Sequence, residues 1–286
     1  MQSRRDGDST AATATRGKLR RTDGSEHFCI MMSTNQAPFL LSEQIAFPHP
    51  KHALAEPDGL LAIGGALTPD WLLTAYANGI FPWFNDDTDI ICWWSPGERG
   101  VLRPGGMHVS RSLRKRIRNA GFAVTFDKDF AGVIEHCRLT RLRATDSNTN
   151  TATGTWITPA MQRAYNELHS LGVAHSVEVW QDSKLVGGLY GLSLGKMFFG
   201  ESMFALQPDA SKIAFFNLQQ CLTDWSFTLI DCQMMNPHLQ SLGVSPMPRG
   251  EFLQLLYANR SAPTLRGSWQ AKTMQGCTEA GTTPYA

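Results

Sequence analysis

Residues 174–205, AHSVEVWQDSKLVGGLYGLSLGKMFFGESMFA, decide the fold of this chain. Three runs in this stretch, 174–181, 183–195 and 196–204, are alternately or continuously apolar, and only short polar turns separate them. Such spacing predicts an antiparallel meander of strands. Glycine inside a strand weakens a sheet, so the glycines of LVGGLYG and FFGESMF indicate a bulge, a tight side-chain fit, or a ligand lying against the sheet.

The sequence after the meander predicts a helix at 210–225 and then a strand at 227–233 that ends in polar residues. Asp231 and Gln233 are two apart on this strand, so we expect their side chains on the same face. The alternatives for Asp231 are a cap on the following helix, whose N-terminus favours negative charge, and a catalytic role. Glu201, at the end of a neighbouring strand, favours the catalytic role because two acids and an amide then meet at one edge.

The upstream half mixes helices and strands, which together with the meander predicts the α+β class. Thr68 before Pro69 marks the start of a helix, and Gly79 marks its end. The further elements expected in chain order are a short strand and turn at 89–104, a basic helix at 109–119, a strand and helix at 122–137, a flexible loop at 138–153, and a helix from 159 to near 172.

Both ends of the chain are polar, so residues 1–37 are expected to be disordered and residues 259–286 to form a mostly disordered tail. Met31 and Met32 are alternative starts. Between the ends, we expect a smaller α/β domain at 38–98 and a larger domain at 99–258. A chain of 286 residues with 42% hydrophobic residues is long enough to give each of these two domains a hydrophobic core.

Positive charge is concentrated in one segment, although the formal net charge is only +1. Residues 99–126 contain seven Lys or Arg and no Asp or Glu. Arg111, Arg114, Lys115 and Arg118 of the expected basic helix are therefore candidates for contact with the phosphates of an anionic partner. The alternative is a solvated helix face without a partner.

Several classes of protein are not indicated. The six cysteines are scattered, without a CxxC pair or Cys/His metal spacing, so reduced thiols and no metal are expected. No run reaches the ~20 continuous apolar residues of a membrane helix, and the N-terminus lacks an apolar signal core, so a cytoplasmic protein with no membrane partner is expected. No phosphate-loop or nucleophile-elbow motif occurs, and no cofactor is expected.

The polar strand ends are expected to adjoin an apolar pocket. Leu189, Phe198 and Ile230 come from neighbouring strands and suit a bulky hydrophobic ligand group. Four tryptophans stand close to the basic segments: Trp83, Trp93, Trp94 and Trp156. Most tryptophans pack in cores, but aromatic faces beside arginines also stack on nucleobases, so an RNA end is a candidate ligand.

The chain resembles one family, the leucyl/phenylalanyl-tRNA–protein transferases, over roughly residues 45–256. The motifs that carry the resemblance occur in order: EPDGLLAIGG (56–65), GIFPWF (79–84), WWSP (93–96), HVSRSL (108–113), GTWITP (154–159), AHSVEVW (174–180), LVGGLYG (185–191), FFGESMF (198–204), ASKIA (210–214), LIDCQ (229–233) and HLQSLG (238–243). The resemblance implies a GNAT-like C-terminal domain preceded by a smaller α/β domain. It also implies transfer of Leu, Phe or, less well, Met from aminoacyl-tRNA to proteins with N-terminal Arg or Lys, which marks them for degradation.

The same resemblance implies roles for single residues. Asp231 and Gln233 match the proposed catalytic pair, with Glu201 in the same site. The transferred side chain is expected against Leu189, Phe198, Leu218 and Ile230, and the 3′-terminal adenosine against Trp83 and Trp156 with Tyr76 near. Leu218 stands where the family can have an aromatic residue, which predicts a roomier pocket and good use of Phe.

Two other functions fit parts of the sequence. A GNAT-type N-acyltransferase that uses acetyl-CoA would need a glycine-rich loop for the pyrophosphate, and no convincing one is present. A non-enzymatic RNA-binding protein would need only the basic helix and the tryptophans. The protein is expected to be a monomer.

Overall fold

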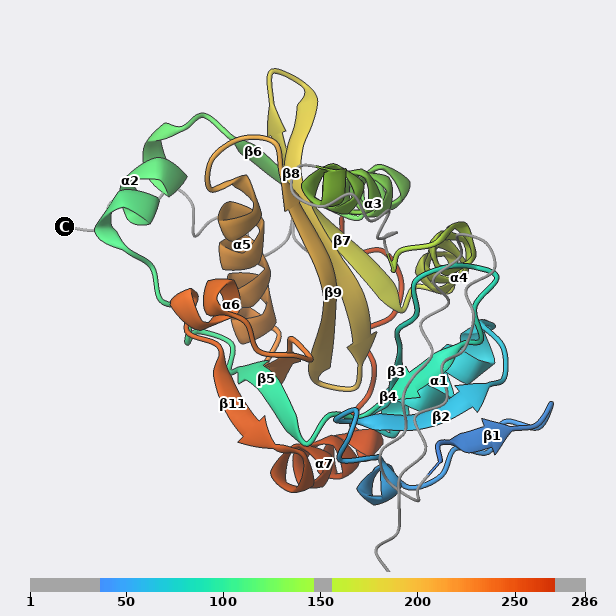
Figure 1. Ribbon diagram of the computed structural model, residues 1–286. Helices are drawn as coiled ribbons and strands as arrows, with labels where there is room; N and C mark the ends of the chain where they lie inside the picture. The colour runs from blue at the N-terminus through green and yellow to red at the C-terminus, as the bar shows by residue number, and fades with distance from the viewer. Residues whose placement is uncertain (1–36, 147–155, 271–286) are drawn as a thin grey trace, which may run out of the picture.

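The computed structural model describes residues 37–146 and 156–270 of the chain. A smaller β-sheet lies below a larger one in the view of Figure 1, and helices cover both faces of the larger sheet. The strands of the smaller sheet end at Trp94 and those of the larger sheet begin at Glu98. The disorder expected for residues 1–36 and 271–286 lies outside the described residues.

The smaller sheet has the strand order β1-β2-β4-β3, formed by Phe39–Leu41, Leu60–Gly64, Cys92–Trp94 and Phe81–Pro82. Helix η1 (Pro50–His52) precedes β2, and helix α1 (Pro69–Ala77) follows it. Helix α1 begins after Thr68 as predicted and ends before Gly79, whose φ of +74° favours glycine. Trp71 of α1 stacks on Trp93 of β4, which attaches the helix to the sheet.

The larger sheet has the strand order β11-β5-β10-β9-β8-β7-β6. Its strands are β5 (Glu98–Leu102), β6 (Ala123–Phe126), β7 (Ala174–Gln181), β8 (Lys184–Leu194), β9 (Met197–Ala205), β10 (Leu229–Asp231) and β11 (Ser245–Pro248). Strands β7, β8 and β9 form the predicted antiparallel meander. Strand β10 runs parallel to β9 and antiparallel to β5, so the sheet is mixed and the predicted α+β class is confirmed.

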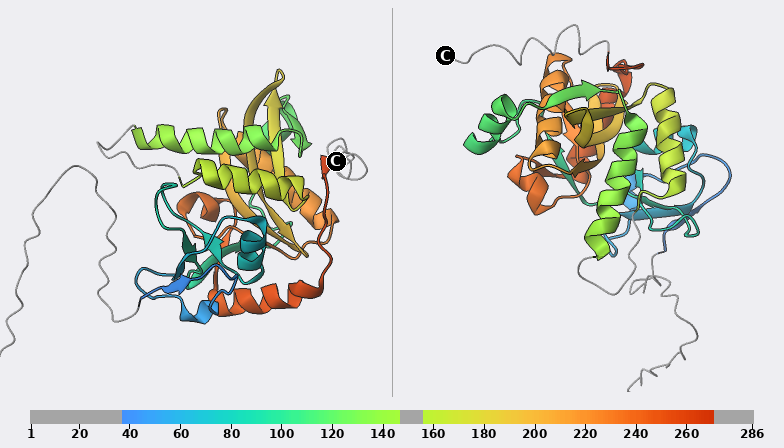
Figure 2. Two further views of the ribbon diagram at one scale, coloured as in Figure 1. Left: turned by 90° about the vertical axis from the view of Figure 1, so that its right-hand side faces the viewer. Right: turned by 90° about the horizontal axis from the view of Figure 1, so that it is seen from above.

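Helices form a layer on each face of the larger sheet, as the view from above in Figure 2 shows. Helices α3 (Phe130–Asp146) and α4 (Pro159–Ser170) pack on one face, and α5 (Ala210–Asp224) packs on the other. The remaining helices are α2 (Arg111–Asn119), α6 (Pro237–Ser241), α7 (Arg249–Ala258) and η2 (Asn259–Ser261). Strand residues alternate between the two layers: Phe198 belongs to the core cluster of α5, and Phe199 to the core cluster of α3 and α4.

A β-bulge interrupts strand β9 at Glu201. Tyr190 of β8 pairs with Ser202 and Gly191 pairs with Gly200, so Glu201 is an extra residue without an opposite partner. A bulge bends the strand and redirects one side chain, and here that side chain is a carboxylate. The glycines of the meander therefore mark both a bulge and a close fit, since a Cβ on Gly191 would lie 2.7 Å from the Phe198 ring.

The flexible loop predicted from residue 138 is wrong in its first part, because helix α3 continues to Asp146. Residues 138–143, RLTRLR, are mostly good helix formers, and Arg138 forms an ion pair with Glu135 one turn earlier at 2.9 Å. The Ser, Asn and Thr content that suggested a loop lies mainly after these residues. The rest of the predicted loop, from residue 147, lies outside the described residues.

The mostly disordered tail predicted from residue 259 contains an ordered part, which extends as far as Gln270. Helix η2 and a following extended segment pack on the protein, and Trp269 is fully buried. One buried tryptophan holds a stretch that is otherwise polar, and composition alone does not reveal such a long-range contact.

Two smaller predictions also fail. Strand β10 ends at Asp231, and Gln233 has a left-handed φ of +61°, so the two residues do not share a strand face as predicted. Cys92 and Cys232 are free thiols as predicted, but Cys221 is disulfide-bonded. The scattered spacing of the cysteines gave no sign of a pairing.

Candidate active site

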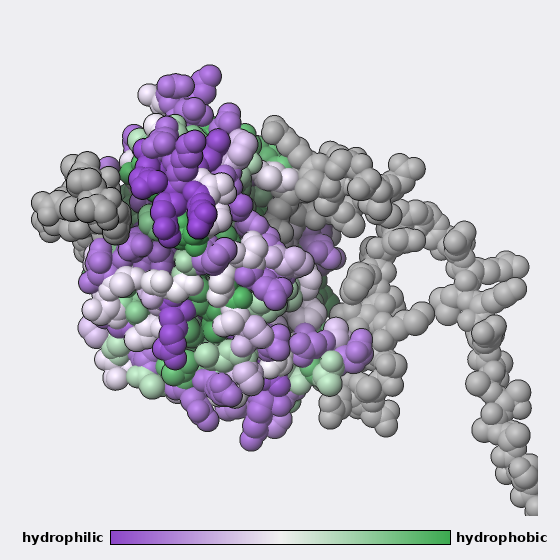
Figure 3. All heavy atoms as spheres, turned by 90° about the vertical axis from the view of Figure 1, so that its left-hand side faces the viewer, coloured by the Kyte–Doolittle hydropathy of each residue, from purple (hydrophilic) through white to green (hydrophobic). Residues whose placement is uncertain are grey.

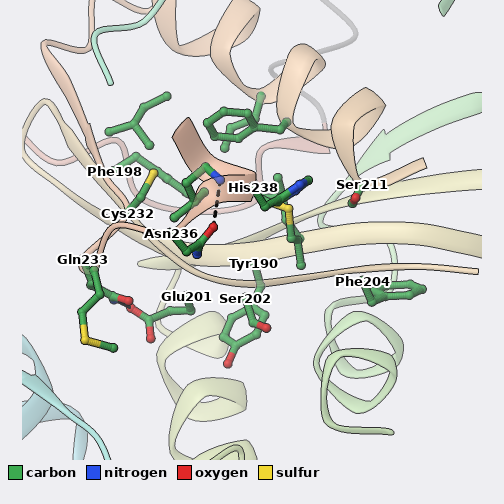
Figure 4. A pocket seen from close by; sticks show the side chains of 18 of the residues that line it. Tyr190, Phe198, Glu201, Ser202, Phe204, Ser211, Cys232, Gln233, Asn236 and His238 are labelled. Carbon is green, nitrogen blue, oxygen red and sulfur yellow. Dashed lines mark hydrogen bonds between the residues drawn. The ribbon is translucent and has the colours of Figure 1, made fainter. Parts of the chain in front are cut away.

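A cavity of about 650 Å³ lies between strands β8, β9 and β10 and helices α5 and α6 (Figure 4). The four residues predicted for an apolar pocket all line it: Leu189, Phe198, Leu218 and Ile230. Each of these side chains is at most 3% exposed, and all four belong to one core cluster, so their positions are fixed by packing. A cavity with this apolar floor suits one bulky hydrophobic side chain.

Two of the four tryptophans singled out from the sequence line the cavity. Trp83, directly after β3, and Trp156, before α4, are half-buried and present aromatic surface at its wall. Trp94 supports Trp83 from outside, because its Nε1 donates a hydrogen bond to the Trp83 carbonyl at 2.8 Å. Trp93 is fully buried in the smaller sheet and has a structural role.

Two tyrosines hold the carboxylate of Glu201 from behind the cavity. Tyr76 of α1 donates a hydrogen bond to Glu201 Oε1 at 2.6 Å, and Tyr165 of α4 donates one to Oε2 at 3.0 Å. The two hydroxyl oxygens also lie 2.5 Å apart. Tyr76 was expected near an adenosine, but it is fully buried and does not line the cavity, so its position is that of a support for Glu201.

Burial raises the pKa of Glu201 from 4.5 to about 7, although hydrogen bonds from Tyr76, Tyr165 and Gln233 partly oppose this shift. The same burial and the charge of Glu201 raise the pKa values of both tyrosines well above 10, so both hydroxyls stay protonated. Tyr76, Tyr165 and Glu201 make three close oxygen–oxygen contacts, but the two tyrosine hydroxyls supply only two protons for them. A proton on Glu201 would supply the third contact, which agrees with a carboxyl group that titrates near neutral pH.

The side-chain amide of Gln233 has a fixed orientation. Its Nε2 donates a hydrogen bond to Glu201 Oε1 at 2.8 Å, and both residues line the cavity on the same side (Figure 4). The ionised carboxylate of Glu201 accepts hydrogen bonds only, so in that state it faces the NH₂ group of the amide and not the carbonyl. The carbonyl oxygen Oε1 of Gln233 is therefore left to accept a hydrogen bond from a bound ligand.

Asp231 does not line the cavity and forms a buried ion pair with Arg99 of β5. The Nε of Arg99 donates to Asp231 Oδ1 at 3.2 Å, and Nη2 donates to Oδ2. Oδ1 also accepts the backbone N–H of Gln233 at 2.9 Å. Asp231 thus holds the turn that carries Gln233, while Glu201 holds the amide. The alternative of a helix cap does not apply, because Asn236 caps α6 through a 2.9 Å bond from Leu239 N.

Cys232 also lines the cavity, but its environment does not favour a nucleophile. Burial, followed by the charge of Asp231, raises the pKa of the thiol, so the reactive thiolate is disfavoured. Among residues 37–146 and 156–270, no group of three or more His, Cys, Asp or Glu side chains is arranged to hold a metal ion. In the same residues, no helix is long and apolar enough to cross a membrane.

The basic helix α2 presents its cations to solvent. Leu113 faces the core, whereas Arg111, Arg114, Lys115 and Arg118 are exposed. Figure 3 shows strongly hydrophilic side chains gathered in the upper part of the face that carries this helix. Arg99, which belonged to the same basic segment in the sequence, is fully buried and does not contribute to that surface.

The sequence did not indicate the roles of Arg99 and Tyr165. Arg99 lies in a run of basic residues, where solvent exposure was the natural expectation. Tyr165 occupies a core position of α4 together with Met161 and Leu168, and its hydroxyl gives no signal in the sequence. An arginine directly before the apolar residues GVL of the same short strand was the one available hint of a buried ion pair.

Two family models match the chain. The model described as leucyl/phenylalanyl-tRNA protein transferase matches residues 101–257, and that of the N-terminal domain of the same transferase matches residues 65–97. Proteins named leucyl/phenylalanyl-tRNA–protein transferase are similar to the chain in sequence. The protein of Chromohalobacter salexigens is 53% identical over 85% of this chain and 92% of its own length. The protein of Pseudomonas aeruginosa is 52% identical over 76% of this chain and 92% of its own length.

Similarity to solved structures is slight. The C-terminal domain of a putative lysylphosphatidylglycerol synthetase from Agrobacterium fabrum has a TM-score of 0.33 and 13% identity, over 69% of this chain and 57% of that chain. A GCN5-related N-acetyltransferase from Kribbella flavida has a TM-score of 0.31 and 12% identity, over 65% of this chain and 63% of that chain. With TM-scores this low, the α+β class rests on the observed strand order.

We predict that Asp231→Ala lowers the free energy of unfolding by about 3–5 kcal/mol, because it leaves Arg99 buried without its partner. Asp231→Asn should be milder, since the amide oxygen can still accept one hydrogen bond. Denaturant unfolding of both variants, beside Asp86→Ala at an exposed position, measures the effect. A loss below about 1 kcal/mol for Asp231→Ala would contradict a sealed ion pair.

A second prediction concerns Glu201→Gln and pH. The folded-state pKa of Glu201 lies above its unfolded value, so the folded protein holds an extra proton between about pH 4.5 and 7, and stability falls as pH rises through that window. The Glu201→Gln variant has no carboxyl group to titrate at this position, so it does not show this loss of stability. Its stability relative to wild type should therefore increase by about 2–3 kcal/mol from pH 5 to pH 8.

Thermal or denaturant unfolding at the two pH values tests this prediction, and Glu135→Gln is the control. The hydrogen bonds from Arg138 lower the pKa of Glu135, so the stability of Glu135→Gln relative to wild type should not increase between pH 5 and pH 8. A stability difference between Glu201→Gln and wild type that does not change with pH would rule out titration of Glu201 near neutrality.

Proposed function

The chain belongs to the leucyl/phenylalanyl-tRNA–protein transferase family, and from that premise we propose how its cavity carries out the reaction. As a member of this family, the protein is an aminoacyltransferase that moves an aminoacyl group from tRNA to the N-terminus of a protein. This activity decides against an acetyl-CoA-dependent N-acyltransferase and against a non-enzymatic RNA-binding protein.

The cavity binds the 3′ end of the aminoacyl-tRNA in this proposal. The transferred side chain lies on the apolar floor of Leu189, Phe198, Leu218 and Ile230. The terminal adenosine lies against Trp83 and Trp156, whose faces can stack on a base at ~1–3 kcal/mol. The aminoacyl ester is then placed between these two sites, beside Glu201 and Gln233.

The reaction needs a positioned amine more than a covalent nucleophile, because the ester is already activated. The amine nitrogen of the acceptor attacks the ester carbonyl carbon, the bond to the ribose 3′ oxygen breaks, and this oxygen leaves with a proton. Holding ester and amine at contact distance can lower the barrier by ~7–11 kcal/mol. An N-terminal ammonium has a pKa near 8, so it must first release a proton.

Gln233 and Glu201 act on that amine in our proposal. Gln233 Oε1 accepts a hydrogen bond from the attacking amine and so directs its lone pair at the ester. Glu201 accepts a hydrogen bond from the NH₂ group of the same amide at 2.8 Å, and in its ionised form its negative charge polarises the amide carbonyl toward the amine. From the resemblance, Asp231 was expected to form a catalytic pair with Gln233. Its carboxylate binds Arg99 and, of Gln233, only the backbone N–H, so we assign it a positioning role.

One observation carries this proposal: the oriented Gln233 amide and the apolar floor line the same cavity. The family resemblance supports further features, namely Leu and Phe as donors with Met as a poorer one, acceptors with N-terminal Arg or Lys, and degradation of the product. The proposal also includes a monomer in the cytoplasm. Transfer of labelled Leu from charged tRNA to a peptide beginning with Arg, beside one beginning with Ala, tests the donor and acceptor together.

We predict that Gln233→Ala slows transfer roughly 10²-fold while the dissociation constant for Leu-tRNA changes less than about twofold, because the amide contacts the attacking amine and not the tRNA. Single-turnover transfer and filter binding measure the two quantities. Gln240→Ala, at an exposed position of α6, is the matched control. Equal transfer rates in Gln233→Ala and wild type would remove Gln233 from the mechanism.

The helix α2 prediction concerns tRNA affinity. If Arg114 and Lys115 contact phosphates, replacing both by Gln should flatten the slope of log Kd against log salt by about 1.4–1.8. The single-turnover rate at saturating tRNA should stay unchanged. Lys184→Gln, at the exposed first residue of β8, should leave the slope as it is. An unaltered slope in the double variant would leave α2 a solvated face.

A further inference from the structure

The segment after helix α7 is attached along the edge of the protein by hydrogen bonds to loops of the larger sheet. Asn259 accepts the backbone N–H of Lys196 at 2.6 Å, and Thr264 accepts that of Gly195 at 2.8 Å. Gly267 donates to the Gly172 carbonyl at 3.0 Å. These residues, 259–270, lie beyond the part of the chain that the family model matches, which ends at residue 257.

The segment ends in Trp269, which is fully buried and held on several sides. Its ring stacks on His175 of β7 with a centroid distance of 3.8 Å and an interplanar angle of 8°. Its backbone N–H donates to Asp127 Oδ2 at 2.7 Å, and its Nε1 donates to the Leu265 carbonyl at 3.1 Å. The position of the indole is therefore fixed by stacking and by hydrogen bonds.

Trp269 also contacts a wall of the cavity from behind. The ring centroids of Trp269 and Phe198 lie 5.9 Å apart, and Phe198 lines the cavity. Trp269 belongs to the same core cluster as Leu189, Leu218 and Ile230, although it does not itself line the cavity. The Phe198 ring thus has the cavity on one side and the indole on another.

Phe198 has little room to move away from the cavity. A Cβ on Gly191 would lie only 2.7 Å from its ring, so the ring already rests on the backbone of β8. The indole of Trp269 blocks a second direction. In a close-packed interior, a side chain held in this way takes the position that its neighbours impose.

We propose that Trp269 is a specificity-determining residue that sets the depth of the aminoacyl side-chain pocket by fixing Phe198. The inference rests on the proposed function of the cavity. Trp269 acts through Phe198 and touches no substrate, so it is a positioning residue. With the indole in place the pocket is shallow enough to contact the branched end of Leu. A smaller residue at 269 lets Phe198 move back, so the pocket deepens in favour of the longer Phe side chain.

The experiment uses one tRNA body charged with either Leu or Phe, so that all contacts outside the pocket stay constant. The readout is the ratio of kcat/KM for Phe to kcat/KM for Leu. We expect Trp269→Phe to raise this ratio at least threefold, which is a small part of the 10–200-fold that one methylene can be worth in an apolar pocket. The control is Trp71→Phe, a buried tryptophan in the core of the smaller sheet.

A loss of stability alone would lower the amount of active protein equally for both donors, so it would not change the ratio. Trp71→Phe should therefore leave the ratio at the wild-type value even if its melting temperature falls. An unchanged ratio in Trp269→Phe, with the protein folded, overturns the inference.

Phe198→Leu separates this inference from the proposed function. If Phe198→Leu does not change the ratio, the assignment of the cavity as the side-chain pocket is wrong. If Phe198→Leu changes the ratio and Trp269→Phe does not, only the role of Trp269 is wrong. If both change it, the double variant should show the same ratio as Phe198→Leu alone, because Trp269 acts through the phenyl ring. Additive effects would contradict that route.

Discussion

The buried ion pair between Arg99 and Asp231 connects the parts of the protein that must meet for the site to exist. Asp231 ends β10, and Arg99 lies on the neighbouring strand β5. A third donor of the guanidinium, Nη1, binds the Gly79 carbonyl after α1 at 2.8 Å, and the group lies over the Phe252 ring of α7 at 4.5 Å. One fully buried cation thus joins the larger sheet to the loop after α1 and to helix α7. Removing a charge pair from water is costly, and this geometry offsets part of the cost because each of the three guanidinium nitrogens donates a hydrogen bond.

The polar groups that line the cavity depend on this ion pair for their position but are not part of it. Glu201 leaves the strand pattern through a bulge, and two tyrosines from α1 and α4 bind it from behind. Strand alternation on both sides of the bulge stays intact, since Phe198 and Met203 pack toward α5 and Phe199 and Phe204 toward α3. The extra residue therefore places a carboxylate at the cavity without moving an apolar side chain to the wrong face. Its raised pKa shows that the fold carries this group at a cost to stability.

Local patterns in the sequence predicted much of the fold and the floor of the cavity. The meander, helix α5 and the start of α1 follow from apolar runs and from cap residues that act over a few positions. Leu189, Phe198 and Ile230 could be placed together because they stand on adjacent strands. Contacts across long distances in sequence could not be predicted in this way.

The same limit explains the errors. Arg99 and Asp231 are 132 positions apart, so a basic segment could not reveal that one of its members is buried. The left-handed conformation of Gln233 broke the two-residue alternation on which its expected position rested. Tyr76 was placed by resemblance at the adenosine, and only the packing of α1 against α4 shows that its hydroxyl reaches Glu201.

The position of Trp269 near the end of the chain has a consequence for the order in which the protein is made. Domains fold as they leave the ribosome, the N-terminal parts first. The strands and helices that form the cavity are complete by α6, but the indole behind Phe198 emerges later, after α7. A nascent chain surrounded by charged tRNA therefore holds the Gln233 amide before it holds the indole that supports Phe198. Synthesis of residues 259–270 completes the wall behind Phe198.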